Sequence, residues 1–417
     1  MCAAAAASED GSSSRPSFTC FTHNAWTYWR DRQEDTFCVG TQVVLDPESG
    51  AHVDCALRNL TEEKQLMKPH AQALDRIADN WYWTGTRYLL DRFMHFRRNG
   101  TESISVQLAD DAVHVPERTV LLVKREGGNV INNVWHVFMQ MMSLWLSLDV
   151  MRATINPATG QPFYTDEDVK NTQVMILDQD KEGHLYELWN MFGDLPTIRR
   201  ADSPPLKSTR VVLPLAGGKN PIWQSRLELP NCNSSILLQA FVNRILNFYH
   251  IPLSPPPRPQ NTSTTTTKAP LNLVFVDRKN YRLLTNQSHL LTSLHSHLTT
   301  THPHVHLEII DFASYPSFPS QILKLRSTDI LLGVHGAGLT HTLFLPPKST
   351  VVEIQPPGLR YFGFAALAKF LGHRYLQVYG EEREYEGMTH NWQADDVFLN
   401  EGEFLRLVDR AVEGWDG

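Results

Sequence analysis

Residues 328–355 read TDILLGVHGAGLTHTLFLPPKSTVVEIQ, and this stretch decides how the C-terminal half of the chain is expected to fold. Asp329–Val334 is a short apolar run, which is typical of a buried parallel strand. Leu339–Leu345 fits a short helix that ends at the two following prolines. Ser349–Ile354 reads as the next strand. Strand, turn, helix and strand in this order are how α/β sheets build a nucleotide pocket.

The turn between the first strand and the helix is rich in small residues. Gly336 and Gly338 leave the backbone N–H groups accessible, so a diphosphate can approach them closely. Glu353, near the end of the second strand, is placed to bind ribose hydroxyls. The spacing is neither G-x-G-x-x-G nor that of a P-loop, so neither fingerprint is supported. The alternative is a tight turn that simply collects glycines, although His335 inside the turn is unusual for such a turn.

The composition is that of an ordinary globular protein. A length of 417 residues corresponds to about two or three domains. Hydrophobic residues make up 42% and charged residues 20%, which is enough for a full core. The net charge of −7 provides no global positive field for nucleic acid. No window approaches 18 uninterrupted apolar residues, so the sequence predicts no transmembrane segment.

The first part of the chain is rich in alanine, serine and cysteine. Residues 1–17 are expected to be disordered, and they lack the basic and leucine-rich parts of a secretion leader. The segment 18–54 is expected to be irregular. Cys20, Cys38 and Cys55 fit either disulfides in a secretory lumen or reduced core thiols, and none forms a C-x-x-C pair. Five N-x-S/T sequons weakly favour the secretory route. They begin at Asn59, Asn99, Asn233, Asn261 and Asn286.

Thr119–Lys124 predicts a strand, followed by a turn and a long helix that begins near the string VINN. Asn132, Asn133 and His136 fall in the first turns of this helix. They lie near the carboxyl edge of the predicted sheet, where α/β proteins bind their ligands. Polar residues at that place indicate acceptor binding or proton transfer. The alternative is an asparagine helix cap with an incidental histidine.

Thr172–Leu177 predicts a second strand, which ends in Asp178 and Asp180. A D-x-D pair at a strand end can hold Mn²⁺ or Mg²⁺, but acidic turns of this kind are also common without a metal. Arg210–Leu215 predicts a further strand, which closes an N-terminal α/β domain. The aromatic run Trp81–Trp83 is assigned to core packing.

A helix at Leu237–His250 precedes Ile251–Pro270, a Pro/Thr-rich segment that is expected to be a flexible insertion. Leu271–Val276 then predicts the first strand of a second domain. Arg278 and Arg282 follow this strand, and arginine pairs with phosphate oxygens in a bidentate manner. The alternative, which normally holds for a single arginine, is a solvated surface position.

Strands and helices alternate over residues 271–380, which predicts a doubly wound parallel sheet. The histidine-rich stretch His295–His306 does not match a zinc-site spacing. The remaining predicted elements are helix Gln287–Thr299, strand His304–Ile310, helices Pro319–Arg326 and Tyr361–Leu371, strand Arg374–Val378 and helix Glu403–Val412.

Several strings in this order point to a family. VDRKNYRLLTN, DILLGVHGAGLTHTLFLP and VVEI follow one another over about residues 270–380, and NVWH lies around His136. The strings resemble glycosyltransferase family 61. The resemblance implies a GT-B architecture, in which two Rossmann-like α/β domains face each other across a cleft. It implies an acceptor-side domain at 18–235, a helix and insertion at 236–270, and a nucleotide-sugar-binding domain at 271–417.

The resemblance also implies a reaction and a site. The reaction is inverting transfer from a UDP-sugar to a protein or glycan acceptor, without a metal, in the ER or Golgi lumen. Asn133 and His136 would face the acceptor, and Glu353 would face the ribose. The residues that would hold the diphosphate are Arg278, Arg282, His335, Gly336, Ala337 and Gly338.

Inversion needs a base that takes the acceptor proton on the face opposite the diphosphate. We prefer His136 for this role, with Asp178 as the competing candidate. The first hypothesis is transfer of N-acetylglucosamine from UDP-N-acetylglucosamine to protein serine or threonine. The alternatives are xylosyl or other glycosyl transfer to a glycan or polysaccharide, and a catalytically silent sugar-nucleotide-binding protein.

Overall fold

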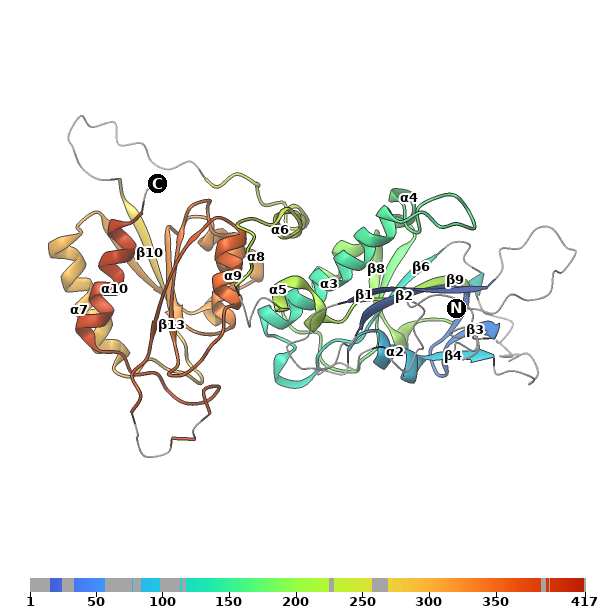
Figure 1. The fold of residues 1–417 in the computed structure, drawn as a ribbon, viewed down its shortest axis with the longest axis horizontal. Helices are drawn as coiled ribbons and strands as arrows, with labels where there is room; N and C mark the ends of the chain where they lie inside the picture. Colours follow the sequence, from blue (N-terminus) through green and yellow to red (C-terminus); the bar gives the residue numbers. More distant parts are fainter. Residues whose placement is uncertain are drawn as a thin grey trace, which may run out of the picture. The chain divides into compact units, whose positions relative to one another are not determined.

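The chain divides into two compact units, Met1–Gln224 and Ser225–Gly417 (Figure 1). The predictions for residues 1–15, for Trp81–Trp83 and for 257–268 of the insertion lie outside the described residues. The computed structural model describes residues 16–24, 34–56, 77, 84–97, 113–114, 118–224, 229–256, 269–383, 388–389 and 391–415.

The first unit is built around a mixed sheet of nine described strands. The strands are β1 (Ser17–Asn24), β2 (Glu34–Asp46), β3 (Gly50–Ala56), β4 (Met94–Arg97), β5 (Val113–His114), β6 (Thr119–Val123), β7 (Thr172–Ile176), β8 (Leu195–Arg199) and β9 (Leu206–Leu213). Their order is β4-β3-β2-β9-β6-β7-β8, with β1 beside β2 and β5 beside β9. The β9-β6-β7-β8 part is parallel, whereas β2 pairs antiparallel with β1, β3 and β9.

Strands β1 to β3 correct the prediction of an irregular segment at 18–54. Val43 and Leu45 of β2 are buried, and this alternation with less buried neighbours is the period of two of a half-buried strand. Mixed polar and aromatic residues conceal the pattern in the sequence. Cys20 and Cys38 lie opposite each other on β1 and β2 and form a disulfide.

Replacing both Cys20 and Cys38 with serine is expected to lower the free energy of unfolding by about 3 kcal/mol, because the bond closes a long loop. The two cysteines are 18 residues apart. Urea denaturation measures the loss. Cys232→Ser is the matched control, since Cys232 is a free, exposed thiol, and its unfolding should equal that of the parent chain. A double variant as stable as this control would contradict the prediction. Cys55, also disulfide-bonded, stays unchanged throughout.

The long helix α3 spans Val134–Ala153 and is buried on nearly all sides. Its sequence is apolar all round, which suits a helix enclosed within a domain. Asn133 is its N-cap, and the side-chain Oδ1 accepts hydrogen bonds from the backbone N–H groups of Trp135 and His136. The helix therefore begins after Asn132 and Asn133, and not before them as predicted.

The other helices of the first unit are short. None of the helices in the described part of the chain is long and apolar enough to span a bilayer. The α-helices are α2 (Thr86–Phe93), α4 (Asp166–Val169) and α5 (Pro221–Gln224), and the 3-10 helices are η2 (Gly128–Val130), η3 (Tyr186–Phe192), η4 (Arg200–Asp202) and η5 (Gly217–Lys219).

The second unit contains a parallel sheet of five described strands, which confirms the predicted doubly wound sheet. The strands are β10 (Leu271–Val276), β11 (Val305–Ile310), β12 (Ile330–Val334), β13 (Thr350–Gln355) and β14 (Arg374–Tyr379). Their order is β11-β10-β12-β13-β14. The chain passes from β10 to β11 on one side and then places β12 on the other. The topological switch point, where such sheets bind ligands at the carboxyl ends of their strands, therefore lies between β10 and β12.

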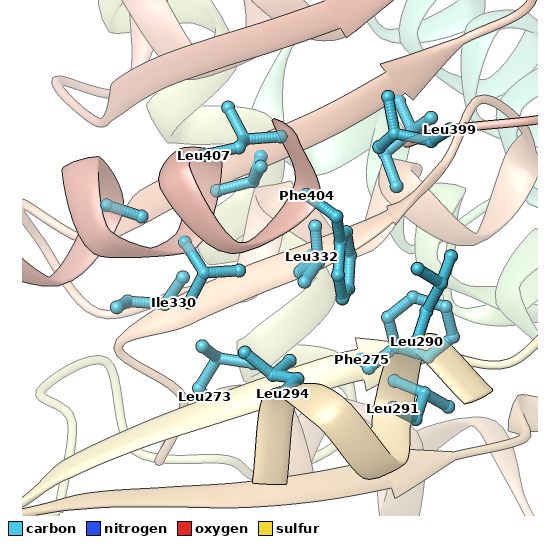
Figure 2. Packing of buried hydrophobic residues seen from close by; sticks show 14 of the residues in the cluster. Leu273, Phe275, Leu290, Leu291, Leu294, Ile330, Leu332, Leu399, Phe404 and Leu407 are labelled. Atoms are coloured by element: carbon cyan, nitrogen blue, oxygen red, sulfur yellow. The ribbon is translucent and has the colours of Figure 1, made fainter. Parts of the chain in front are cut away.

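Helices cover both faces of this sheet (Figure 1). They are α6 (Ile236–Phe248), α7 (Gln287–Thr301), α8 (Phe318–Leu325), α9 (Gly363–Phe370) and α10 (Glu401–Glu413), with the 3-10 helices η6 (Phe312–Ser314) and η7 (Ala337–Phe344). On one face, Leu294 of α7 and Phe404 of α10 pack with Phe275 and Leu332 of the strands (Figure 2). Leu331, which alternation turns to the other face, is equally buried. Burial on both faces explains the continuous apolar runs in the sequence.

Two predicted elements change character in the second unit. The helix predicted at Leu339–Leu345 is the 3-10 helix η7, which begins earlier, at Ala337 within the glycine turn. Helix α6, which was predicted to form a segment of its own together with the insertion, lies in the second unit. Ser235 at its start donates a backbone hydrogen bond to Phe370 of α9, and Tyr249 at its end contacts the ring of Phe318 in α8.

Candidate functional site

Two loops meet at the switch point of the five-stranded sheet. The first follows β10 and carries Arg278 and Arg282, and the second follows β12 and carries His335 and Gly336. Arg278 joins the loops, because its Nη1 donates a hydrogen bond of 3.2 Å to the carbonyl oxygen of His335, 57 residues away. The fold therefore brings together two strings that the sequence analysis assigned to one site.

Gly336 provides the space for Arg278. A Cβ atom at Gly336 would lie 1.7 Å from Nη1 of Arg278, so any side chain there must displace the guanidinium group. Gly338 packs in a similar way against β10, since its Cβ would lie 3.0 Å from Cγ1 of Val276. Ala337, between the two glycines, begins η7. The two glycines therefore allow close packing against Arg278 and Val276, which is a more specific role than forming a tight turn.

Arg278 and Arg282 form a positive group without a directly paired carboxylate. Within the described residues neither side chain forms a salt bridge. Arg278 donates only to backbone carbonyl oxygens, those of His335, of Tyr281 at 3.1 Å and of Asn280 at 3.5 Å. Burial, and then the charge of Arg282, lower the pKa of Arg278 to about 10. A bound anion offsets both effects, so this pair is suited to a phosphate group.

The backbone around Arg282 is strained. Tyr281 and Arg282 have φ angles of 53° and 54°, in the left-handed region that non-glycine residues rarely adopt. Such residues cost about 1–3 kcal/mol each and cluster at functional sites. The Arg282 guanidinium lies 5.6 Å from the centre of the Trp392 ring, and its buried Nε finds no hydrogen-bond partner among the described residues. The strain therefore positions a donor that the protein itself leaves unused.

A buried carboxylate orients His335. Nδ1 of His335 lies 2.5 Å from Oε1 of Glu353, and the hydroxyl group of Tyr375 donates to the other carboxylate oxygen. Burial is the main reason that the pKa of Tyr375 is raised, so the phenol keeps its proton. Because a carboxylate only accepts, His335 donates from Nδ1 and presents Nε2. Glu353 is 0% exposed, and the predicted ribose contact would have to displace one of its two partners.

A cavity of about 1160 Å³ opens beside this group, within the second unit. Trp392 lies next to both the cavity and His335, because it lines the cavity and its ring centre lies 5.7 Å from the ring centre of His335. The wall carries charges of both signs: Arg360 and Arg383 face four acidic residues, and Arg383 pairs with Glu381 and lies over the ring of Phe398. The acidic residues are Glu381, Glu382, Asp395 and Asp396. Ligand pockets commonly measure about 300–1,000 Å³, so the cavity has room for a ligand with several rings.

His136, in the first unit, is oriented in the same manner. Its Nδ1 lies 2.5 Å from Oε2 of Glu126, which is on the turn after β6. Nδ1 therefore donates to the carboxylate, and Nε2 is the basic nitrogen. Glu126 is buried, and its Oε1 has no hydrogen-bond partner among the described residues. The two side chains line a pocket of about 10 Å³, room for about one water molecule.

Asp178 is engaged by Arg125. Its Oδ1 lies 2.6 Å from Nη2 of Arg125, and its Oδ2 accepts from the backbone N–H and from Nε of the same residue. The backbone oxygen of Asp180 accepts from Arg125 and Arg199. Arginines therefore organise the D-x-D turn. Neither aspartate falls in a group of three or more metal-ligating side chains within the described part of the chain.

Asp178→Asn is expected to lower the free energy of unfolding by about 3–5 kcal/mol, since it leaves the Arg125 charge buried without a counter-charge. The two side chains are only 4% and 5% exposed. Urea denaturation measures the change. Asp166→Asn is the control, because the Asp166 side chain is 99% exposed, and this variant should unfold like the parent chain. Equal stability of the two variants would show that the buried pair is not a structural ion pair.

Comparison with known families identifies the family of the chain. The family model for Glycosyltransferase 61 matches residues 134–352, which is more than half of the chain. The chain belongs to glycosyltransferase family 61. The family 61 region runs from the first residue of α3 into β13. It therefore contains His136, both arginines of the switch point and His335.

Two relatives of this family 61 chain are EGF domain-specific O-linked N-acetylglucosamine transferases. The one from Drosophila melanogaster is 27% identical over 296 residues, which are 67% of this chain and 51% of the relative. The one from Pan troglodytes is 24% identical over 247 residues, 58% of this chain and 41% of the relative. Beta-1,2-xylosyltransferase XAX1 of Oryza sativa subsp. japonica is 33% identical over 109 residues, 25% and 17% of the two chains. The chain spans about half or less of the length of these relatives.

Three residues of the candidate site were not predicted. Glu126 lies in the turn REGGN directly after a predicted strand, so an acid at a carboxyl edge was an available signal. Tyr375 and Trp392 lie in segments whose sequence does not mark them. Only the parallel pairing of β13 with β14, and the return of the chain near residue 392, bring these rings to Glu353 and His335.

Proposed function

We propose that this family 61 chain is a glycosyltransferase that moves a sugar from a UDP-sugar to a hydroxyl group, with inversion at the anomeric carbon. The observation that carries the proposal is the pair Arg278 and Arg282 at a topological switch point, two half-buried guanidinium groups that form no salt bridge with any described residue. A diphosphate supplies the negative charge that this pair lacks. Family membership supports the same class of reaction.

In this proposal the second unit binds the donor. Arg278 and Arg282 offset the charge that develops on the departing UDP, and His335 donates a hydrogen bond to it when Nε2 also carries a proton, with Glu353 balancing the charge of the ring. The start of η7, at Gly336–Gly338, adds backbone N–H groups. The first role of Glu353 is to orient His335, and a contact with the ribose is its second role. The neighbouring cavity receives the remainder of the donor.

The first unit supplies the base. The acceptor oxygen bonds to the anomeric carbon, the bond from that carbon to the UDP oxygen breaks, and Nε2 of His136 takes the hydroxyl proton. Glu126 stabilises the imidazolium that forms, as the carboxylate does in a Ser-His-Asp triad. Asn133, whose Oδ1 caps α3, keeps its amide group for the acceptor. The reaction requires a GT-B arrangement with the two units facing each other, which is part of the proposal.

The proposed donor is UDP-N-acetylglucosamine and the proposed acceptor is a protein serine or threonine, by analogy with the two transferases that match most of this chain. The second candidate is pentosyl transfer to a glycan. The xylosyltransferase of rice and a rice alpha-1,3-arabinosyltransferase favour it, with 33% and 35% identity over shorter stretches. In both cases the arginines take the role that a divalent metal otherwise has at a leaving diphosphate, so we propose metal-independent transfer.

We propose a secretory-pathway lumen, ER or Golgi, as the compartment. The disulfide between Cys20 and Cys38 supports this assignment, because disulfides persist in oxidising compartments and are rare in the cytosol. The sequon at Asn233 is exposed, as an N-glycosylation site must be. Mass spectrometry of the chain expressed in a eukaryotic secretory system, with and without glycosidase treatment, tests whether that asparagine carries a glycan.

Calorimetric titration of the full chain with UDP-N-acetylglucosamine, UDP-xylose and UDP-arabinose tests the donor. UDP release is then measured with an EGF-like domain, with a xylan oligosaccharide and without acceptor. We expect one donor to bind and UDP release to require an acceptor and to survive EDTA. Binding without turnover on any acceptor favours a silent sugar-nucleotide-binding protein. Failure of every UDP-sugar to bind overturns the proposal, and loss of turnover in EDTA overturns its metal-independent part.

A further inference from the structure

Three side chains with metal-ligating atoms meet where helices α7 and α10 pack together. His297 lies on α7, His302 is the residue that ends α7, and Asp409 lies on α10. Nε2 of His297 lies 2.7 Å from Oδ1 of Asp409, and Nε2 of His302 lies 3.0 Å from the same oxygen. All three ligand atoms lie within 4.8 Å of one another. This is the geometry of a three-ligand site that needs little rearrangement.

The distances suit a tetrahedral ion. Zn²⁺ binds histidine nitrogen and carboxylate oxygen at about 2.0–2.2 Å, which places neighbouring ligand atoms about 3.3 Å apart. The contacts of His297 and His302 to Asp409 must therefore lengthen from 2.7 and 3.0 Å to about 3.3 Å. The side chains of His297, His302 and Asp409 are 25%, 10% and 27% exposed. They are held in place by the helices and still open to solvent, which leaves a position for a water ligand.

We propose that His297, His302 and Asp409 bind a divalent ion with a preference for imidazole, with Zn²⁺ as the representative ion. On binding, each imidazole carries its proton on Nδ1 and presents the Nε2 lone pair to the metal. The spacing of the histidines at His295–His306 predicts no zinc site, because spacing shows only ligands within one stretch. The third ligand comes from α10, 107 residues after His302.

The site is separate from the proposed transfer chemistry. His302 precedes the first residue of β11, so the cluster lies at the amino edge of the sheet. The arginines of the switch point follow β10, at the carboxyl edge. An ion here links α7 directly to α10, two helices that pack on the core shown in Figure 2, and stabilises the second unit. Its presence or absence is therefore read from metal binding and thermal stability, and it does not depend on any activity.

The full chain, stripped with chelator and dialysed, is titrated with Zn²⁺ by calorimetry and with Co²⁺ by visible absorption. We expect one ion per chain, a rise in Tm with Zn²⁺, and Co²⁺ bands of the intensity typical of tetrahedral sites. His302→Asn and Asp409→Asn should each weaken binding about tenfold or more and abolish the rise in Tm. His297→Gln, at the more exposed of the two histidines, provides a third variant that removes a ligand with little effect on packing.

His289→Asn is the matched control. His289 pairs with Glu401 between the same two helices, at 2.7 Å, but only one imidazole faces that carboxylate. This variant should bind Zn²⁺ as the parent chain does. The proposal is overturned if the parent chain shows no saturable zinc binding, or if folded Asp409→Asn and His297→Gln variants bind as tightly as the His289→Asn control.

Discussion

Replacing His136 with alanine is expected to lower kcat by about 10²–10⁴-fold, the range that a positioned general base contributes, and to leave donor affinity unchanged. The reason is geometric. Glu126 fixes the ring through Nδ1 at 2.5 Å, so Nε2 is the nitrogen that can accept the hydroxyl proton. His136 lies in the first unit, whereas the proposed donor site lies in the second. Calorimetry with the UDP-sugar and steady-state UDP release measure the two quantities separately.

Glu126→Gln tests the positioning residue behind His136. Glutamine keeps a hydrogen-bond acceptor near Nδ1 but removes the charge that stabilises the imidazolium, so kcat should fall by less than in the alanine variant. The pH profile of kcat should also move, which a merely structural role for Glu126 would not produce. The assignment of the base is wrong if His136→Ala retains near-normal turnover while a folded Asp178→Asn variant is inactive.

The strands of the second unit were predictable because they are buried on both faces. Leu331 and Leu332 are neighbours that point to opposite faces and are equally buried, so the sequence shows a continuous apolar run. The strands of the first unit were harder to predict. Strand β2 is buried on alternating positions only in part, and its polar neighbours conceal the period of two. The disulfide between Cys20 and Cys38 depends on the register of β1 and β2, which spacing alone does not determine.

Only some residues of the candidate site were predictable from the sequence. Arg278, Arg282 and His335 were predictable because they lie in recognisable strings directly after strands. The role of Glu353 was not, since an acid on a strand can face a ligand or turn inward. Burial and two hydrogen bonds turn it toward His335. Asp178 was ambiguous for the same reason, and its bond to Arg125 depends on two strands that are 53 residues apart in the chain.

Arg278→Ala is expected to weaken UDP binding about 10–100-fold and to lower kcat/KM by about 10²–10³-fold, because one charge-assisted contact to the leaving diphosphate is lost. The stability of the variant separates this role from a structural one. Arg278 is half-buried beside Arg282, and burial together with that like charge lowers its pKa to about 10. Its removal relieves repulsion and desolvation, which offsets the loss of its hydrogen bonds to three backbone carbonyl oxygens, so urea denaturation should show little loss of stability.

Two further variants test whether the loss of UDP binding is specific to the Arg278 guanidinium. Lys279→Ala removes a neighbouring charge on the same loop, but that side chain is 61% exposed and pairs with Asp277, so UDP binding should stay unchanged. Gly336→Ala keeps both arginines and displaces the Arg278 guanidinium, whose Nη1 would lie 1.7 Å from the new Cβ. It should therefore reproduce most of the Arg278→Ala defect. An Arg278→Ala variant that unfolds more easily and still binds UDP normally would assign the arginine to the scaffold, because a structural donor stabilises the loop whether or not a diphosphate is bound.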